Sequence, residues 1–335
     1  MDYKHFIGID VSKKWLDFAV VVEGNVLFHL QVNNSKDGIS EFMNQLFKQP
    51  NYQANTSLFC MEHTGVYNNH LISFLTKMKT NICIESGRQI KQSQGIQRGK
   101  NDKVDAERIA LYAYKNRDYI RKWAPKREVV VKLKYLLSLR DRLINASKQL
   151  STPMKEDSGF IDKNLSKRIT TLSKRTITSL KKDIADVDEE ILQLIQTDVE
   201  LKRLFTIITS IKGVGAITAA QILITTNEFK DINSPKKFAC YCGVAPFEHS
   251  SGSSIRGKTR VSQLGNKNVK RLLHMAAMVS VMYNEELKLY YQRKVEAGKN
   301  KMLVLNAVRN KLIHRIFSCV KHDRLYENNY QNVLA

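Results

Sequence analysis

The feature that most constrains the fold is an apolar run near the start of the chain that a single carboxylate interrupts. Residues 6 to 12 read Phe-Ile-Gly-Ile-Asp-Val-Ser, and a second apolar run follows at residues 16 to 22. Apolar, β-branched runs of this length are typical of buried strands. A carboxylate such as Asp10 is costly to bury unless a cation or hydrogen-bond donors compensate it. Asp10 is therefore either a turn residue at the surface or part of a site that supplies such partners.

Strand-like and helix-like segments alternate through the first quarter of the chain. Three apolar runs between residues 4 and 32, separated by short turns, predict an antiparallel meander. Helices and strands then alternate, at residues 36 to 48, 57 to 61, 66 to 78 and 81 to 84. This order predicts a mixed sheet with helices on both faces. Glu62 follows one of these strands directly, and such sheets place their chemistry at the carboxyl ends of strands.

Two further carboxylates open the next helix. Residues 86 to 100 carry four basic residues among Gln, Ser and Gly, and this composition predicts a basic surface loop. Beyond it, Asp102 and Asp105 are three residues apart, so on a helix they project from one face. Acids in a first helical turn are often only caps or dipole complements. Together with Asp10 and Glu62, however, they make a set of oxygen ligands that would hold a pair of Mg²⁺ ions for phosphoryl transfer.

The middle of the chain predicts a helical hairpin. Apolar residues recur at spacings of three and four from residue 136 to 150 and again from residue 184 to 201. A polar stretch at residues 151 to 162, which contains Pro153, acts as the turn between them. A basic first arm and an acidic second arm would also pair electrostatically. The apolar seam closes either on itself or on a second subunit, and a single sequence does not separate the two.

The last third combines a glycine turn with a basic segment. Lys212, Gly213 and Gly215 lie between two apolar helices, and glycines there allow positive φ and let backbone amides approach a phosphate, as in a helix-hairpin-helix. Residues 252 to 275 contain no acid and six basic residues, namely Arg256, Lys258, Arg260, Lys267, Lys270 and Arg271. A serine and glycine cluster like the one before them usually means only a flexible loop. In a basic pocket, though, a serine hydroxyl could be held against a phosphate. Helices near residue 266 and from about 300 to 320 complete a mainly helical region.

Charge narrows the range of partners. The chain has 335 residues and a formal net charge of +22, which raises the odds of a polyanionic partner because displaced counterions favour binding to phosphates. The basic residues are spread along the chain and not gathered on one amphipathic helix, so no membrane partner is expected. We expect a cytoplasmic protein. The five cysteines form no CxxC motif, no apolar run reaches transmembrane length, and the first residues do not have the layout of a signal peptide.

The motifs together resemble a known family. The runs FIGIDVSKKWLDFAVV, MEHTGVYNNHL and KNDKVDAERIA are similar to the N-terminal DEDD domain of the insertion-sequence one-hundred-ten transposases, relatives of the Piv and MooV invertases. The run GVAPFEHSSGSSIRGKTRVSQLGNKNVKRLLHMAAM resembles the C-terminal transposase domain of the same family. The resemblance covers nearly the whole chain in the family's domain order. It implies α/β plus all-α architecture, with a RuvC-like (ribonuclease H-type) catalytic domain at residues 1–122, a coiled-coil hairpin at 123–204 and a mainly helical serine transposase domain at 205–335.

The resemblance also implies roles for particular residues. The metal-binding acids are Asp10, Glu62, Asp102 and Asp105, and the nucleophile is Ser251, with Ser250 as the neighbour that could be confused with it. The implied nucleic-acid contacts are Lys212, Gly213, Gly215, Arg256, Lys258, Arg260 and Lys267. The implied cofactor is Mg²⁺, and the implied partners are donor and target DNA and a structured guide (bridge) RNA. The protein would be a homodimer, with pairing into tetramers left open, in the nucleoid of a bacterial cell.

Two other functions remain open at this level. In a metal-dependent nuclease, for instance a Holliday-junction resolvase, water is the nucleophile and Ser251 belongs to a loop. In a non-catalytic scaffold, the glycine turn and basic segments bind nucleic acid and the four acids have no role. We expect the DNA transposase, because a scaffold has no use for four placed carboxylates.

Overall fold

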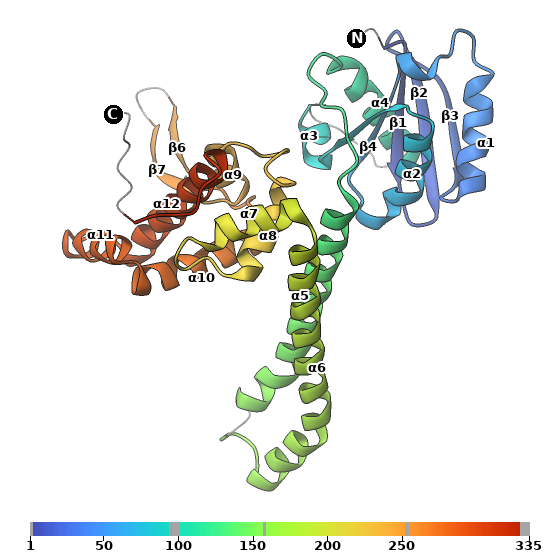
Figure 1. The fold of residues 1–335 in the computed structure, drawn as a ribbon. Helices are drawn as coiled ribbons and strands as arrows, with labels where there is room; N and C mark the ends of the chain where they lie inside the picture. The colour runs from blue at the N-terminus through green and yellow to red at the C-terminus, as the bar shows by residue number, and fades with distance from the viewer. Residues whose placement is uncertain (1–2, 94, 96–100, 157–158, 252–254, 329–335) are drawn as a thin grey trace. The chain divides into compact units, whose positions relative to one another are not determined.

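The protein divides into two compact units, Met1–Pro125 and Lys126–Ala335. The computed structural model describes residues 3–93, 95, 101–156, 159–251 and 255–328, except for the side chains of His249, Ser251, Ile255, Arg256 and Lys258. Among these residues no helix combines the length and the apolar character that crossing a membrane requires. The two units are described separately below (Figure 1).

A five-stranded mixed sheet forms the centre of the first unit. Its spatial order is β3-β2-β1-β4-β5. The meander comprises β1 (His5–Val11), β2 (Trp15–Val22) and β3 (Asn25–Asn33), which pair antiparallel. β4 (Ser57–Glu62) and β5 (Asn81–Glu85) add in parallel to β1. The predicted mixed sheet is therefore confirmed, with β1 at its centre.

Helices cover both faces of this sheet (Figure 1). On one face, α1 (Lys36–Phe47) and α2 (Asn69–Lys77) pack against alternate side chains of the strands, including Ile7, Ile9 and Phe18. On the other, α4 (Asp102–Lys115) and α3 (Gly87–Gln92) pack against the intervening positions, such as Phe6 and Cys60. Short 3-10 turns at Ala54–Thr56 and Gly65–Asn68 precede β4 and α2. Because side chains alternate along a strand, each strand contributes to both cores.

The second unit begins with two long helices, α5 (Glu128–Glu156) and α6 (Lys163–Thr197), which lie side by side as a hairpin (Figure 1). The charge pairing expected between the arms occurs where Arg140 binds Asp188. At the root of the hairpin, Leu133, Leu137, Ile191 and Ile195 are buried in the core of the unit. Among the described residues from 138 to 190, none is buried. Among the described residues, the buried contacts of the hairpin are thus confined to its root.

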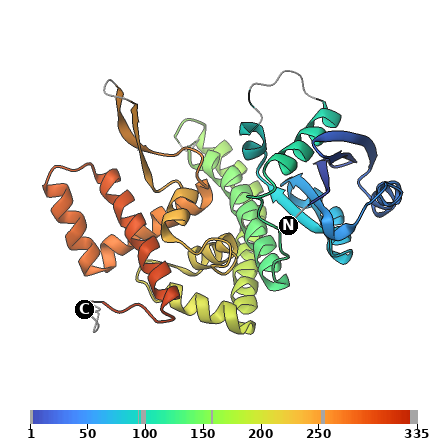
Figure 2. The ribbon, with the colours of Figure 1, turned by 90° about the horizontal axis from the view of Figure 1, so that it is seen from above.

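Shorter helices and one ribbon complete the second unit. The helices are α7 (Val199–Thr209), α8 (Ala216–Thr226), α9 (Pro235–Tyr241), α10 (Lys267–Tyr283), α11 (Glu285–Glu296) and α12 (Lys301–Lys321). Strands β6 (Pro246–Ser251) and β7 (Ile255–Val261) form an antiparallel ribbon (Figure 2). At its root the backbone of Gly243, with φ +64°, lies so close to Gly265 that a Cβ on Gly265 would stand 2.4 Å from the Gly243 Cα atom. Only glycine fits this crossing.

Three local predictions were wrong. Residues 87–92 of the expected basic loop form α3, because the Ser86 hydroxyl caps the helix and Ile90 is buried; residues 94 and 96–100 lie outside the described part. The expected turn after residue 150 starts later, since α5 continues through Pro153 to Glu156. The segment expected as a loop around Ser251 is largely the β6–β7 ribbon, with residues 252–254 outside the described part.

Candidate active site

Two of the predicted carboxylates, Asp10 and Glu62, share one face and one edge of the sheet. Phe6 and Gly8 of β1 point towards α4, and the period-two alternation of a strand puts Asp10 on the same face. In β4, Cys60 faces α4, and Glu62 lies two residues further along the strand, so it faces α4 too. β1 and β4 are parallel, so their carboxyl ends lie at the same edge. Two of the four predicted acids therefore come from neighbouring strand ends, as expected.

Close packing between α4 and β1 brings the other two acids to this edge. A Cβ added to Gly8 would lie 2.2 Å from both the Ala106 carbonyl oxygen and the Ala110 backbone nitrogen. The helix backbone therefore rests directly on the strand, which only glycine permits. Asp102 and Asp105 occupy the first turn of α4, and the Asn101 side chain caps it by accepting from the Lys103 amide at 3.0 Å. The glycine contact thus fixes the acidic end of α4 beside β1.

Electrostatics shows that these acids are near neighbours. Burial, followed by the negative charges of Asp102, Asp105, Glu62 and Asp17 in that order, raises the pKa of Asp10 to about 6. A carboxylate surrounded in this way favours a proton or a cation. A positive charge placed among these acids would relieve the repulsion on Asp10.

The four acids interact through their charges, but their side chains do not meet at one point. Among the residues that the structure describes, no group of three or more His, Cys, Asp or Glu side chains is gathered tightly enough to hold a metal ion. Asp105 is engaged with Arg108 at 2.9 Å, and Asp102 is exposed. The donor set consists of carboxylate oxygens, which is the chemistry that Mg²⁺ prefers. Binding would require the carboxylates to turn inwards and Arg108 to release Asp105.

Two more acids lie on this face, and sequence reasoning missed both. Asp17 pairs with Asp10 across β1 and β2, and it is 3% exposed. The Gln31 amide donates to both of its oxygens, at 3.2 and 3.0 Å, and His29 Nε2 lies 3.0 Å from one of them. Asp17 is therefore a satisfied structural acid. The strand register, which a single sequence does not reveal, would have found it.

Glu85 is the second missed acid. It pairs with Glu62 at the end of β5, and its carboxylate accepts from the Ser86 amide at 2.9 Å and from the Tyr112 hydroxyl at 3.4 Å. Burial, followed by the charge of Glu85, raises the pKa of Tyr112 to about 12, so Tyr112 stays protonated and donates. The sequence contained a signal for this acid, because Glu85 is the last residue of its strand, as Glu62 is of β4.

Glycine also makes room for the Glu62 side chain. A Cβ on Gly87, the first residue of α3, would lie 2.2 Å from Glu62 Oε2. The carbonyl of Glu62 accepts from the Asn68 amide at 2.8 Å, and Asn68 also binds the backbone and hydroxyl of Thr64. The loop after β4 is thus held by Asn68, and the position of the Glu62 carboxylate depends on Gly87.

The second unit carries the predicted serine and basic residues. Ser251 is the last residue of β6 and pairs with Ile255, but its side chain, like those of Arg256 and Lys258, lies outside the described part. Arg260 is exposed in β7, and Lys267 is exposed at the first position of α10. The basic residues are thus distributed along the ribbon and the helix that follows it.

The glycine turn between α7 and α8 differs in part from its prediction. Gly213 has φ +99°, and its Cβ would lie 2.1 Å from Ser280 Oγ, which donates to the Lys212 carbonyl at 2.8 Å. Gly213 therefore allows the turn to pack on α10. Gly215 has φ −83°, so the expected positive φ is wrong there. It caps α8 without a side-chain hydrogen bond and faces open space, and Lys212 is exposed beside it.

Comparisons with known proteins agree with this arrangement. Residues 7–156 match the transposase family model of the IS110 DEDD domain, and residues 205–292 match the model "Transposase IS116/IS110/IS902 family". The pilin gene-inverting proteins of Moraxella bovis and Moraxella lacunata are each 27% identical to the chain, over 97% of its length and 98% of theirs. An uncharacterized 43.6 kDa protein of insertion element IS110 from Streptomyces coelicolor is 29% identical over 39% of the chain and 32% of its own length. With both family models matched in order along the sequence, the chain belongs to the IS110 family of transposases.

Proposed function

We propose that the protein is a DNA recombinase that cuts and rejoins DNA to move an insertion sequence. The observation that carries the proposal is that Asp10, Glu62, Asp102 and Asp105 lie near one edge of the sheet, where burial, followed by the charges of the other acids, raises the pKa of Asp10. The pilin gene-inverting proteins, whose name describes inversion of a gene, support the same class of reaction. A net charge of +22 suits a DNA substrate.

The four acids are proposed to hold Mg²⁺. Their oxygen-only donor set and their unbalanced negative charge fit a divalent cation. When bound, the metal would supply electrostatic stabilisation to the attacking and leaving oxygens of a phosphodiester. The chain's own part is to position the cation, with Gly8 fixing the first turn of α4 and Gly87 leaving room for Glu62.

Ser251 is proposed as the nucleophile. Its Oγ forms a bond to phosphorus while the phosphorus–oxygen bond of the DNA strand breaks. The serine proton passes to water, and the departing sugar oxygen takes one up as a free hydroxyl. Attack by a freed hydroxyl on the phosphoserine then restores the serine and joins the strands without net hydrolysis. Neighbouring arginines would stabilise the charge on the phosphate.

The remaining finer assignments concern partners. Lys212, Gly213 and Gly215 are proposed to grip a DNA backbone in the manner of a helix-hairpin-helix, for which the open surroundings of Gly215 and the exposed Lys212 are the support. Arg256, Lys258, Arg260 and Lys267 are proposed as further phosphate contacts. The α5–α6 hairpin is proposed as a coiled coil that joins protomers into a homodimer, because its outer part has no buried residue. The family resemblance extends the proposal to a structured guide RNA.

A covalent-adduct assay tests the mechanism. The purified protein is incubated with labelled donor and target DNA and Mg²⁺, denatured, and resolved on a gel. We expect a protein–DNA adduct that Ser251→Ala abolishes and the matched variant Ser250→Ala retains. Normal cleavage by Ser251→Ala would instead establish a metal-dependent nuclease that uses water. Unchanged activity in Asp10→Asn and Asp102→Asn would establish a binding scaffold. Sequencing RNA that copurifies from the native locus tests the guide.

A further inference from the structure

Arg309 is a buried arginine in α12 that has no acidic partner among the residues that the structure describes. It is only 5% exposed. Its terminal nitrogens bind two neutral groups, Asn306 Oδ1 at 3.3 Å and His274 Nδ1 at 3.1 Å. The Nε–H finds no acceptor among the described residues. Burial of an ionised group without an ionic partner is strongly unfavourable, so this arrangement calls for an explanation.

The neighbours of Arg309 on α10 are the cation Lys270 and the imidazole of His274, and neither is acidic. Lys270 and His274 lie one turn apart on α10, and burial followed by the charge of Arg309 lowers the pKa of each. His274 accepts from Arg309 through Nδ1 and is therefore neutral with its proton on Nε2. The acid that α10 does contact, Asp141, is bound by Asn268 at 2.9 Å and lies 3.7 Å from Arg271.

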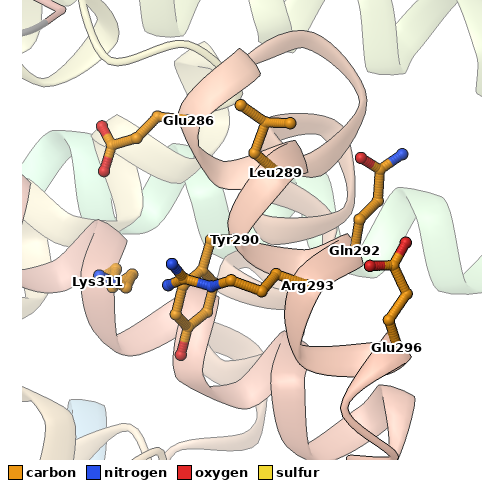
Figure 3. A pocket seen from close by; sticks show the side chains of 7 residues that line it. All are labelled: Glu286, Leu289, Tyr290, Gln292, Arg293, Glu296 and Lys311. Carbon is orange, nitrogen blue, oxygen red and sulfur yellow. The ribbon is translucent and has the colours of Figure 1, made fainter.

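Two other half-buried arginines of the unit have acidic partners. Arg127 binds Asp198 and Glu228, and Arg315 binds Glu286 at 2.6 Å. The neighbouring hollow of about 540 Å³ between α11 and α12 contains both signs of charge (Figure 3). Within it, Lys311 lies 4.7 Å from the centre of the Tyr290 ring. That hollow gives no reason to expect an anion, whereas the surroundings of Arg309 do.

The location of this cluster links it to the ribbon. Asn306, which binds Arg309, also donates to the Val244 carbonyl at 2.9 Å, just before β6 begins. Lys270 and His274 are half-buried, so the cluster extends from the buried Arg309 to side chains that are partly open to solvent. The six residues of β6 span about 20 Å, at ~3.3 Å per residue. The cluster therefore lies at the root of the ribbon, and Ser251 ends the same strand at the other end.

We propose that Arg309, His274 and Lys270 form an anion site that binds a backbone phosphodiester of DNA at the root of the β6–β7 ribbon. The identity of the anion as DNA rests on the proposed function, and the site itself rests on the unbalanced cluster. A strand that runs along the ribbon advances about 3.4 Å per nucleotide, so this phosphate lies about six nucleotides from the one that Ser251 attacks. The site would thus hold the strand in register without reading bases.

Two measurements on the full chain test the site. The first is the thermal midpoint with inorganic phosphate against chloride at matched ionic strength. We expect phosphate to raise the midpoint of the wild type and of Lys321→Met, which removes an exposed cation from the same helix, but not that of Arg309→Met. The second is affinity for a DNA duplex as a function of salt. Arg309→Met should weaken binding about tenfold or more and reduce the slope of log affinity against log salt by about one.

Lys270→Met is the second variant, in case Arg309→Met does not fold. It alters a half-buried side chain and should lose a smaller part of the phosphate effect. Without ligand, both variants should be as stable as the wild type or more so, since each removes a crowded positive charge. A phosphate shift that survives in both variants would overturn the site. If the wild type binds phosphate but no DNA, the proposed function fails while the anion site stands. If DNA binding of the wild type and Arg309→Met is equal, the phosphodiester assignment fails.

Discussion

Replacing Asp10 by asparagine is expected to stabilise the metal-free protein while it abolishes activity on DNA. The folded protein raises the pKa of Asp10 from 3.8 to about 6, which is a shift of about two units. At about 1.4 kcal/mol per unit this corresponds to about 3 kcal/mol. Asp10 is only partly buried, and solvent screening reduces the figure to about 1–2 kcal/mol. Asparagine removes the charge and hence this cost.

The pH dependence follows from the direction of the shift. Between about pH 4 and pH 6 the folded protein keeps the Asp10 proton and the unfolded chain has lost it, so the stability of the wild type falls as pH rises through this window. Asp10→Asn does not lose stability in this window. Its free energy of unfolding should therefore equal that of the wild type near pH 4 and exceed it by the full amount above pH 6. For a unit of this size the gain corresponds to about 4–8 °C in the melting temperature.

The chain offers a specific probe for this experiment. Its two tryptophans, Trp15 and Trp123, both lie in the first unit, so their fluorescence in urea follows that unit. The assay compares the wild type, Asp10→Asn and the exposed control Asp118→Asn in EDTA from pH 4 to pH 8. Equal or lower stability of Asp10→Asn at pH 8, or a difference that does not change with pH, would refute the electrostatic argument. Addition of Mg²⁺ should stabilise the wild type more than the variant.

Three further substitutions probe the packing that positions the site. Gly8→Ala places a Cβ 2.2 Å from the α4 backbone and should lower the free energy of unfolding by about 1–3 kcal/mol, measured by tryptophan fluorescence in urea. Gly87→Ala pushes on the Glu62 carboxylate and should reduce strand cleavage at least about tenfold with a small change in the urea midpoint. Arg127→Met leaves the buried carboxylate of Glu228 with Lys230 alone and should cost about 2–4 kcal/mol, measured by helical circular dichroism.

Each of these has a control or a contradicting outcome. Wild-type stability of Gly8→Ala would show that α4 does not rest on β1 as closely as the structure has it. Wild-type cleavage by Gly87→Ala would show that the observed Glu62 position is not the active one. Wild-type stability of Arg127→Met would show that Lys230 suffices to balance Glu228.

The sequence predicted the strand acids because their position depends on local pattern. Asp10 and Glu62 each end an apolar run, and parallel strands then place them at one edge. Asp102 and Asp105 followed from helical spacing. Asp17 and Glu85 depend on register between strands, which local pattern does not encode. Whether Arg309 has an acidic partner depends on which side chains surround it in the folded unit, and the local sequence does not contain that information.

Elements with weak local signals were the ones missed. The β6–β7 ribbon is polar and serine-rich, and its pairing is fixed by the glycine crossing at its root, which involves residues far apart in sequence. Helix α3 depends on one cap and one buried isoleucine among basic residues. The helices α5 and α6 belong to the same compact unit as the C-terminal helices. The division into parts at residues 1–122, 123–204 and 205–335 stays a prediction, as do the coiled coil and the helix-hairpin-helix.

The outer part of the α5–α6 hairpin, which has no buried residue among those described, can vary in length. Between residues 138 and 190 no described side chain is buried, and the contacts with the rest of the unit lie near the root, at Asp141 and Val187; beyond them, whole helical turns can be removed from both arms together without creating a cavity in the unit. The packing of the unit therefore does not determine how long the outer part of the hairpin is. Its length is free to be tuned by whatever it touches, while the root around Leu137 and Ile191 must be kept.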